Sequence, residues 1–140
     1  MKLLPVFAIL YALALTACAA ATDPSPAPRG ELTGRDWTLV ELNGQAVTAR
    51  RPAHIALDAD TQRYSGSGGC NAISGTFALD PGNRIRFSPG IHTMMACPAG
   101  TDVEGAFLQA LARTDSYSVK GNTLTLEKID AGIVARLEAR

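Results

Sequence analysis

Apolar and polar residues alternate in short runs along the chain after residue 30, and this period of two predicts β-strands. In Asp36–Leu42 the alternation places Trp37 and Leu39 on one buried face, and Asn43-Gly44 directly behind the run is a turn signal. The same reasoning predicts further strands at residues 54–58, 62–65, 75–79, 85–87, 117–120, 123–127 and 133–137. Residues 91–96 form another apolar stretch, and as a strand they would bury at least one of Met94 and Met95.

One segment departs from the period of two and predicts a helix. Thr101 with Glu104 three residues later fits a capping box, and the run ends near Arg113. Its apolar residues fall at helical spacing and must face a sheet: Val103, Phe107, Ala110 and Leu111. About eight short strands with this one helix, and no βαβ alternation, predict a mainly β (α+β) domain. We expect a strongly curved antiparallel sheet or a small, partly open β-barrel.

The first 17 residues have the features of a bacterial lipoprotein signal peptide. Lys2 precedes an apolar run at residues 3–15, which is well short of the about 20 residues that a membrane span requires. The following Leu15-Thr16-Ala17-Cys18 resembles a lipobox, the motif at which bacteria acylate the cysteine and cleave before it. Cys18 is therefore the predicted lipidation site and the first residue of the mature chain. The alternative is an ordinary secreted protein with a stray cysteine in its signal.

The segment behind that cysteine, residues 18–30, predicts a tether. Pro24, Pro26 and Pro28 alternate with small residues, a composition that favours an extended polyproline conformation. Two or three acyl chains on Cys18 would hold the protein at a membrane permanently. Position 19 is alanine, not the aspartate of an inner-membrane retention signal, so we expect anchoring at the outer membrane, facing the periplasm. Residues 31–140 are long enough for one domain and too short for two.

The predicted mature chain is nearly neutral. Removal of Lys2 leaves 12 of the 13 basic residues against 13 acidic ones. Its few basic clusters are typical of solvated surface, and a nucleic-acid binder would need a concentrated basic face. We expect a monomer with no cofactor, whose partners are the membrane and an envelope protein or lipid.

Cys70 and Cys97 are the two cysteines that remain after removal of the signal. An exported protein meets an oxidising compartment, so we predict a disulfide between them. Two buried free thiols are one alternative. A metal site built from both cysteines with His54 and His92 is another, although no ligand spacing supports it. A thiol hydrolase with a Cys70–His92 pair is a third, and the disulfide excludes it because an oxidised cysteine is no nucleophile.

Four glycines precede or follow Cys70, at positions 66, 68, 69 and 75. Backbone amides in such a loop can cradle a phosphate, but the segment lacks the following lysine and the helix N-terminus of such sites. We therefore expect the glycines to relieve crowding at a bulge or tight corner. We expect a structural role for Asn71, with its side chain bonded to its own local backbone.

Two cysteine motifs together resemble the META domain family of HslJ-like heat-shock and envelope lipoproteins. They are GGCN at residues 68–71, followed by Gly75-Thr76-Phe77, and TMMACP at residues 93–98, followed by Glu104 and Phe107. The likeness covers residues 32–137. It implies a lipocalin-like, partly open β-barrel with one helix, a disulfide-forming cysteine pair and a loose association with envelope stress, antibiotic tolerance, motility or virulence. The motif positions that we expect to be structural are Gly69, Asn71, Gly75, Thr93 and Pro98.

No acid–base pair, catalytic nucleophile or metal set is evident, and the resemblance implies no enzyme activity. Our leading hypothesis is a non-enzymatic envelope lipoprotein that binds an envelope protein or a lipid chain. A periplasmic protease inhibitor or stress chaperone is the alternative, for which an exposed sheet edge would be the tool. A thiol-dependent hydrolase is a third hypothesis, and it requires a free thiolate at Cys70.

Overall fold

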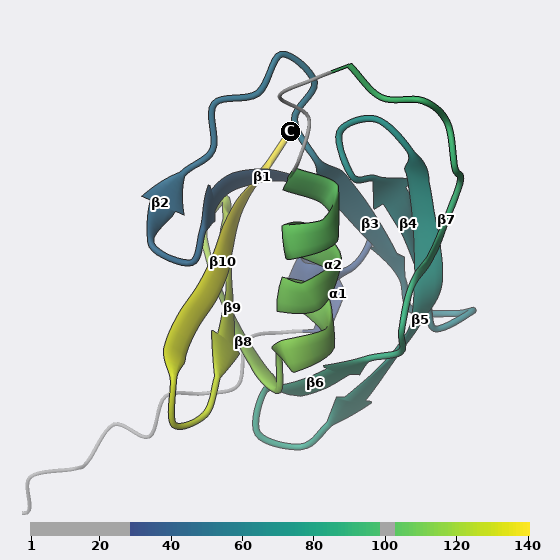
Figure 1. The fold of residues 1–140 in the computed structure, drawn as a ribbon. Helices are drawn as coiled ribbons and strands as arrows, with labels where there is room; N and C mark the ends of the chain where they lie inside the picture. The colour runs from purple at the N-terminus through teal and green to yellow at the C-terminus, as the bar shows by residue number, and fades with distance from the viewer. Residues whose placement is uncertain (1–28, 99–102) are drawn as a thin grey trace, which may run out of the picture.

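The computed structural model describes residues 29–98 and 103–140 (Figure 1). The predicted signal peptide, the lipidation site Cys18, most of the tether and Thr101 lie outside these residues. The elements follow in the order α1 (Arg29–Leu32), β1 (Asp36–Leu42), β2 (Gln45–Ala46), β3 (His54–Asp58), β4 (Arg63–Ser67), β5 (Ala72–Asp80), β6 (Arg84–Phe87), β7 (Ile91–His92), α2 (Val103–Arg113), β8 (Ser116–Lys120), β9 (Thr123–Lys128) and β10 (Gly132–Ala139).

The sheet closes into an antiparallel barrel in the order β10-β9-β8-β6-β5-β4-β3-β1, and β1 returns to β10. Closure depends on β1, because Trp37 is paired with Ile55 of β3 on one side and with Ala139 of β10 on the other. An ion pair between Arg136 of β10 and Glu41 of β1 adds a side-chain contact between these two strands. The mainly β barrel with a helix is therefore confirmed. The sequence predicts a curved open sheet or a partly open barrel, whereas the observed barrel is closed.

Large apolar side chains fill the inside of the barrel. Trp37, Tyr64 and Phe107 are at most 1% exposed. The Trp37 indole N–H donates to the carbonyl of Leu32 at 2.8 Å, which links β1 to α1. The predicted inward positions Trp37 and Leu39 are thus confirmed as core. Further aliphatic side chains exposed by 2% or less complete the interior, among them Ile55, Leu57, Ile73, Ile85, Leu124, Leu126 and Leu137.

The predicted helix is present as α2, which lies in front of the barrel core in Figure 1. Phe107, Ala110 and Leu111 form its buried stripe, as the helical spacing predicts. The helix packs on β1, β6 and β10. None of the helices in the part of the chain described here is long and apolar enough to cross a membrane.

One prediction about the middle of the chain is wrong. Residues 91–96 do not form one strand, since β7 contains only Ile91 and His92, and both Met94 and Met95 are exposed. After β7 the Met95 N–H donates to the side chain of Asn71 and not to a strand backbone, so the β-ladder ends there. The strand predicted at residues 75–79 is present as part of β5, which begins earlier, at Ala72.

Candidate functional site: the disulfide-anchored methionine loop

The segment after β7 is covalently fixed to the barrel. A disulfide joins Cys70, in the turn between β4 and β5, to Cys97, with the two Cα atoms 5.9 Å apart. This is the pairing that the sequence predicts. We call residues 91–98 the methionine loop. Its first two residues are held in the sheet by β5 and its end by the disulfide.

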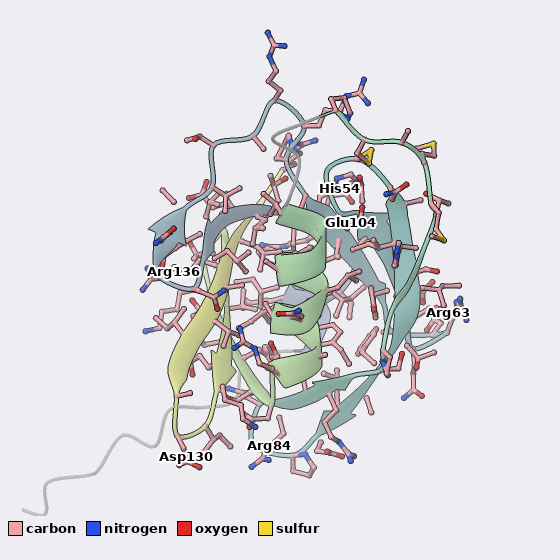
Figure 2. The ribbon with its side chains drawn as sticks, in the orientation of Figure 1. His54, Arg63, Arg84, Glu104, Asp130 and Arg136 are labelled. Carbon is pink, nitrogen blue, oxygen red and sulfur yellow. A yellow bond between two sulfur atoms is a disulfide. The ribbon has the colours of Figure 1, made fainter. Side chains whose placement is uncertain are left out.

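A partly buried carboxylate contact links this turn to the helix. Glu104, in the first turn of α2, points toward the turn between β4 and β5 (Figure 2). Its Oε2 accepts the backbone N–H of Asn71 at 3.0 Å, and its Oε1 accepts the Asn71 side-chain amide at 3.1 Å. The carboxylate that the capping box assigned to the helix start therefore binds a separate segment of the chain.

The carbonyl end of the same amide holds the methionine loop. Asn71 Oδ1 accepts the Thr93 hydroxyl at 3.0 Å and the Met95 N–H at 2.8 Å. Thr93 Oγ1 in turn accepts the N–H of Ala72 at 3.1 Å. The amide nitrogen of Asn71 also lies 3.4 Å from the sulfur of Cys97. Asn71 is only 6% exposed, so its side-chain amide is sheltered from competing water.

The expectation that the Asn71 side chain bonds its own local backbone is wrong. Its partners Thr93, Met95 and Glu104 lie 22, 24 and 33 positions away in sequence. Local asparagine motifs need a backbone group within a few residues that is free to bond. Here the nearby N–H of Gly68 and hydroxyl of Ser67 both bond the carbonyl of Asn71, which leaves the side chain for distant segments.

Two glycines of this region make room for neighbouring side chains, and a third allows a tight corner. A β-carbon at Gly68 would lie 2.3 Å from Cγ of Glu104, so only glycine admits the carboxylate. Gly69 has a φ of +107°, which suits glycine and agrees with the predicted tight corner. A β-carbon at Gly75 would lie 2.6 Å from the ring of Tyr64. Burial of Tyr64 raises the pKa of its hydroxyl. No phosphate-binding helix follows these glycines, because the chain continues into β5.

The methionine loop carries apolar side chains in solvent. Ile91 is 70% exposed, Met94 92% and Met95 59%. All eight residues of the loop, Pro98 included, are exposed. The sequence between Arg86 and Asp102 contains no lysine, arginine, aspartate or glutamate. The result is an uncharged apolar surface whose backbone is fixed at both ends.

The other chemistry considered for these residues has little support in the geometry. In the disulfide, Cys70 has no thiolate to act as a nucleophile. Among residues 29–98 and 103–140, no group of three or more histidine, cysteine, aspartate or glutamate side chains is placed to hold a metal ion. His92 is exposed on β7, in a sheet row next to Ile73.

Comparison with known proteins agrees with the motifs. The model of the META domain matches residues 30–140. The chain belongs to the META domain family. Its cysteine motifs, at residues 68–71 and 93–98, are the two segments that meet around Asn71.

Solved structures share the fold of this META domain. An NMR structure of a protein from Burkholderia xenovorans is 26% identical, with a TM-score of 0.63, over 91% of this chain and 99% of that one. A crystal structure of a DUF4847 family protein from Bacteroides vulgatus is 17% identical, with a TM-score of 0.56, over 76% of this chain and 93% of that one. No curated protein matches the chain.

Sequence reasoning found the motif positions but missed what they do together. Gly69, Asn71, Thr93 and both cysteines lie around one turn and one loop, whereas Gly75 lies within β5 against Tyr64. The role of Glu104 was missed, since its position in a first helical turn is explained equally well by capping. The exposure of Met94 and Met95 was also missed, although the absence of charge on both sides of them was visible in the sequence.

Proposed function

We propose that this META domain protein is a non-enzymatic, HslJ-like lipoprotein of the bacterial envelope that docks a partner protein on its methionine loop. Cys18 carries the lipid anchor, residues 18–30 are the tether, and the protein faces the periplasm from the outer membrane. The resemblance links such a protein to envelope stress or antibiotic tolerance. The sequence features of the first 30 residues support the anchor.

The observation that carries the binding proposal is the combination of exposure and restraint in the loop. An exposed isoleucine and two exposed methionines are unfavourable in an isolated protein, and a patch of this kind is typical of interaction sites. The loop is fixed by a disulfide and by the buried Asn71 contacts, so little ordering entropy opposes binding. Methionine side chains adapt to partners of different shape.

A protein partner is supported over a lipid chain held inside the barrel. Lipocalin-like barrels that bind a ligand need an internal cavity. Here Trp37, Tyr64, Phe77, Phe107 and Leu126 occupy the interior, each at most 4% exposed. The hydrolase hypothesis loses support because its nucleophile, Cys70, is bonded to Cys97.

Photo-crosslinking in living cells tests the docking surface. A photo-reactive amino acid at position 94 of the full chain is expected to capture a defined envelope protein, whereas the same amino acid at position 129 or 133 captures none. Ile129 and Ile133 are the matched controls, because they are exposed apolar residues, at 42% and 38%, in the β9–β10 turn and at the start of β10 respectively. Equal capture from all three positions would remove the methionine loop as the site.

A double variant measures how much the two methionines contribute to capture of the partner. With the photo-reactive residue at position 91, Met94→Ser together with Met95→Ser is expected to lower capture about fivefold, a combined loss of about 1 kcal/mol for the two side chains. Ile129→Ser is the control.

For the anchor, Cys18→Ser is expected to abolish incorporation of radiolabelled palmitate and to release the protein from the membrane fraction. Labelling that persists in Cys18→Ser would exclude the lipidation site.

A further inference from the structure

Strand β7 is paired along one edge only. Its residues Ile91 and His92 lie opposite Ser74 and Ile73 of β5. Within the described parts of the chain, 29–98 and 103–140, no other strand pairs with β7. The neighbouring strand β6 continues the barrel to β8 through a single residue pair, Arg84 and Ser116. The second edge of β7 is therefore open.

The hydrogen bonds show which backbone groups face that open edge. The N–H of Thr93 donates to the carbonyl of Ala72 at 3.0 Å, and the N–H of Met95 donates to Asn71 at 2.8 Å. Successive N–H groups of an extended chain point to opposite edges. The N–H groups of His92 and Met94 consequently point away from β5. Strand β7 and the two residues after it thus present two alternate donors, the N–H groups of His92 and Met94, on the edge away from β5.

Proteins usually protect such an edge with charge, because an exposed row of backbone groups pairs with other chains. The methionine loop has no charged side chain on it. A shallow cavity of about 340 Å³ lies beside β7, and its walls combine the small or apolar Gly66, Ala72, Ile73 and Ile91 with Ser65, Ser74, His92 and Thr93. The cavity fits a small aliphatic or hydroxyl side chain, and its lining contains no carboxylate, lysine or arginine to pair with a charge.

We infer that the open edge of β7 accepts an extended, uncharged and β-prone segment of the partner polypeptide as an added strand. The partner donates to and accepts from the backbone of His92 and Met94, and alternate side chains of the segment contact Ile91 and the methionines. Main-chain bonds supply affinity in this mode and side-chain pockets supply selectivity. The inference rests on the proposed function and specifies the chemistry of its partner.

Strand addition predicts that one edge of the incoming peptide is essential and the other is not. The probe is a fluorescent heptapeptide of alternating threonine and valine, made soluble by a polyethylene glycol tail. Two variants carry N-methyl groups at the odd or at the even positions, which removes the N–H groups from one edge. Fluorescence anisotropy is measured with the full chain. Methylation of one edge is expected to weaken binding at least tenfold, and methylation of the other edge to leave it within twofold.

The protein offers a matched pair of variants at the same position. Met94→Ala and Met94→Pro both remove the thioether, but only proline removes the N–H that faces the open edge. Binding of the unmodified peptide is expected to be about fivefold weaker in Met94→Pro than in Met94→Ala, the effect of one lost hydrogen bond. The Cys70–Cys97 bond and circular dichroism report that both variants are folded. His92→Pro provides a second removal of an edge donor.

The outcomes separate the inference from the proposed function. Equal binding of both methylated peptides, equal affinity of the alanine and proline variants, or no peptide binding overturns strand addition. Docking by the side chains of the loop then still accounts for capture from position 94. A concentration-dependent dimer whose formation Met94→Pro abolishes would make the occupant a second copy of this chain and overturn the assignment to another polypeptide. Capture that does not differ between positions 94 and 129 overturns the proposed function itself.

Discussion

Glu104 binds Asn71 through both of its carboxylate oxygens, one at the backbone N–H and one at the side-chain amide, at 3.0 and 3.1 Å. The two residues belong to different elements, the first turn of α2 and the turn before β5. Because the other end of the Asn71 amide binds the methionine loop, this pair couples the helix to the loop. The disulfide then closes the same cluster covalently.

Asn71→Ala is expected to lower the free energy of unfolding by about 3 kcal/mol. The substitution removes three side-chain hydrogen bonds, to Glu104 Oε1, the Thr93 hydroxyl and the Met95 N–H, each worth about 1 kcal/mol. Glu104 Oε2 keeps the backbone N–H of residue 71. Urea unfolding of the oxidised protein measures the loss. The exposed asparagine of the β8–β9 turn supplies the control, since Asn122→Ala is expected to change stability by less than about 0.5 kcal/mol. Similar losses in both variants would contradict a special role for Asn71.

Gly68→Ala is expected to destabilise the domain by about 1–3 kcal/mol through overpacking. The new β-carbon would lie 2.3 Å from Cγ and 2.7 Å from Cβ of Glu104, near the helix backbone where the side chain cannot move aside. Glu104→Ala removes Cγ and the carboxylate, so the double variant is expected to be more stable than the two separate losses add up to. A double-mutant cycle in urea gives this coupling energy. Strict additivity would mean that Gly68 and Glu104 do not interact.

Loss of the disulfide is expected to destabilise the oxidised domain by about 3–4 kcal/mol, the chain-entropy value for a loop closed over 27 positions. The effect should be local as well, because the methionine loop then depends on β7 and Asn71 alone. Limited proteolysis of Cys70→Ser/Cys97→Ser is therefore expected to cut first within residues 91–98. Initial cleavage in another exposed turn, such as residues 129–132, would show that the disulfide does not restrain the loop.

The strands and the helix could be predicted from the sequence where one side of an element is buried. Asp36–Leu42 and the stripe of Phe107, Ala110 and Leu111 show the expected periods and are confirmed. The stretch at residues 91–96 failed because an apolar sequence does not distinguish a core strand from an exposed binding surface. Its hydrophobicity was visible in the sequence. Its exposure depends on the hydrogen bond between the Met95 N–H and the distant side chain of Asn71, which the sequence pattern does not show.

Barrel closure and the hydrogen bonds of the site could not be predicted, because both depend on pairs of residues that are far apart in the sequence. Trp37 pairs with Ala139, which lies at the other end of the domain in sequence, and a local pattern contains no information on such pairing. The contacts of Asn71 likewise span 22 to 33 positions. The two cysteines were the exception, since a pair of exported cysteines has a strong chemical preference for one bond.

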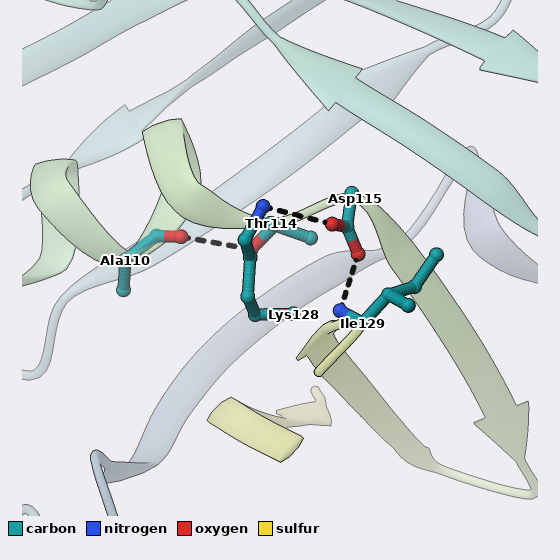
Figure 3. A network of polar contacts seen from close by, with 5 residues as sticks. All are labelled: Ala110, Thr114, Asp115, Lys128 and Ile129. Atoms are coloured by element: carbon teal, nitrogen blue, oxygen red, sulfur yellow. Dashed lines mark hydrogen bonds and ion pairs between the residues drawn. The ribbon is translucent and has the colours of Figure 1, made fainter. Parts of the chain in front are cut away.

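Asp115 predicts a pH dependence of stability. It follows α2, next to Thr114, which caps the helix end by donating to the Ala110 carbonyl at 2.8 Å (Figure 3). Burial alone would raise the pKa of the Asp115 carboxyl. The Ile129 N–H at 2.7 Å and the Lys128 ammonium at 3.0 Å outweigh burial and lower the pKa below its ordinary value of 3.8.

A lowered pKa in the folded state means that Asp115 stabilises the fold above about pH 4 and that this contribution is lost as the pH falls through the lowered pKa. Asp115→Asn is therefore expected to reduce the urea midpoint at pH 7 and to converge on the parent protein as the pH falls through the lowered pKa. Lys128→Met keeps the Ile129 hydrogen bond and is expected to produce a smaller reduction with the same convergence. A difference between Asp115→Asn and the parent that stays constant from pH 7 to pH 2 would assign the effect to packing, because only a charged carboxylate loses its advantage when acid protonates it.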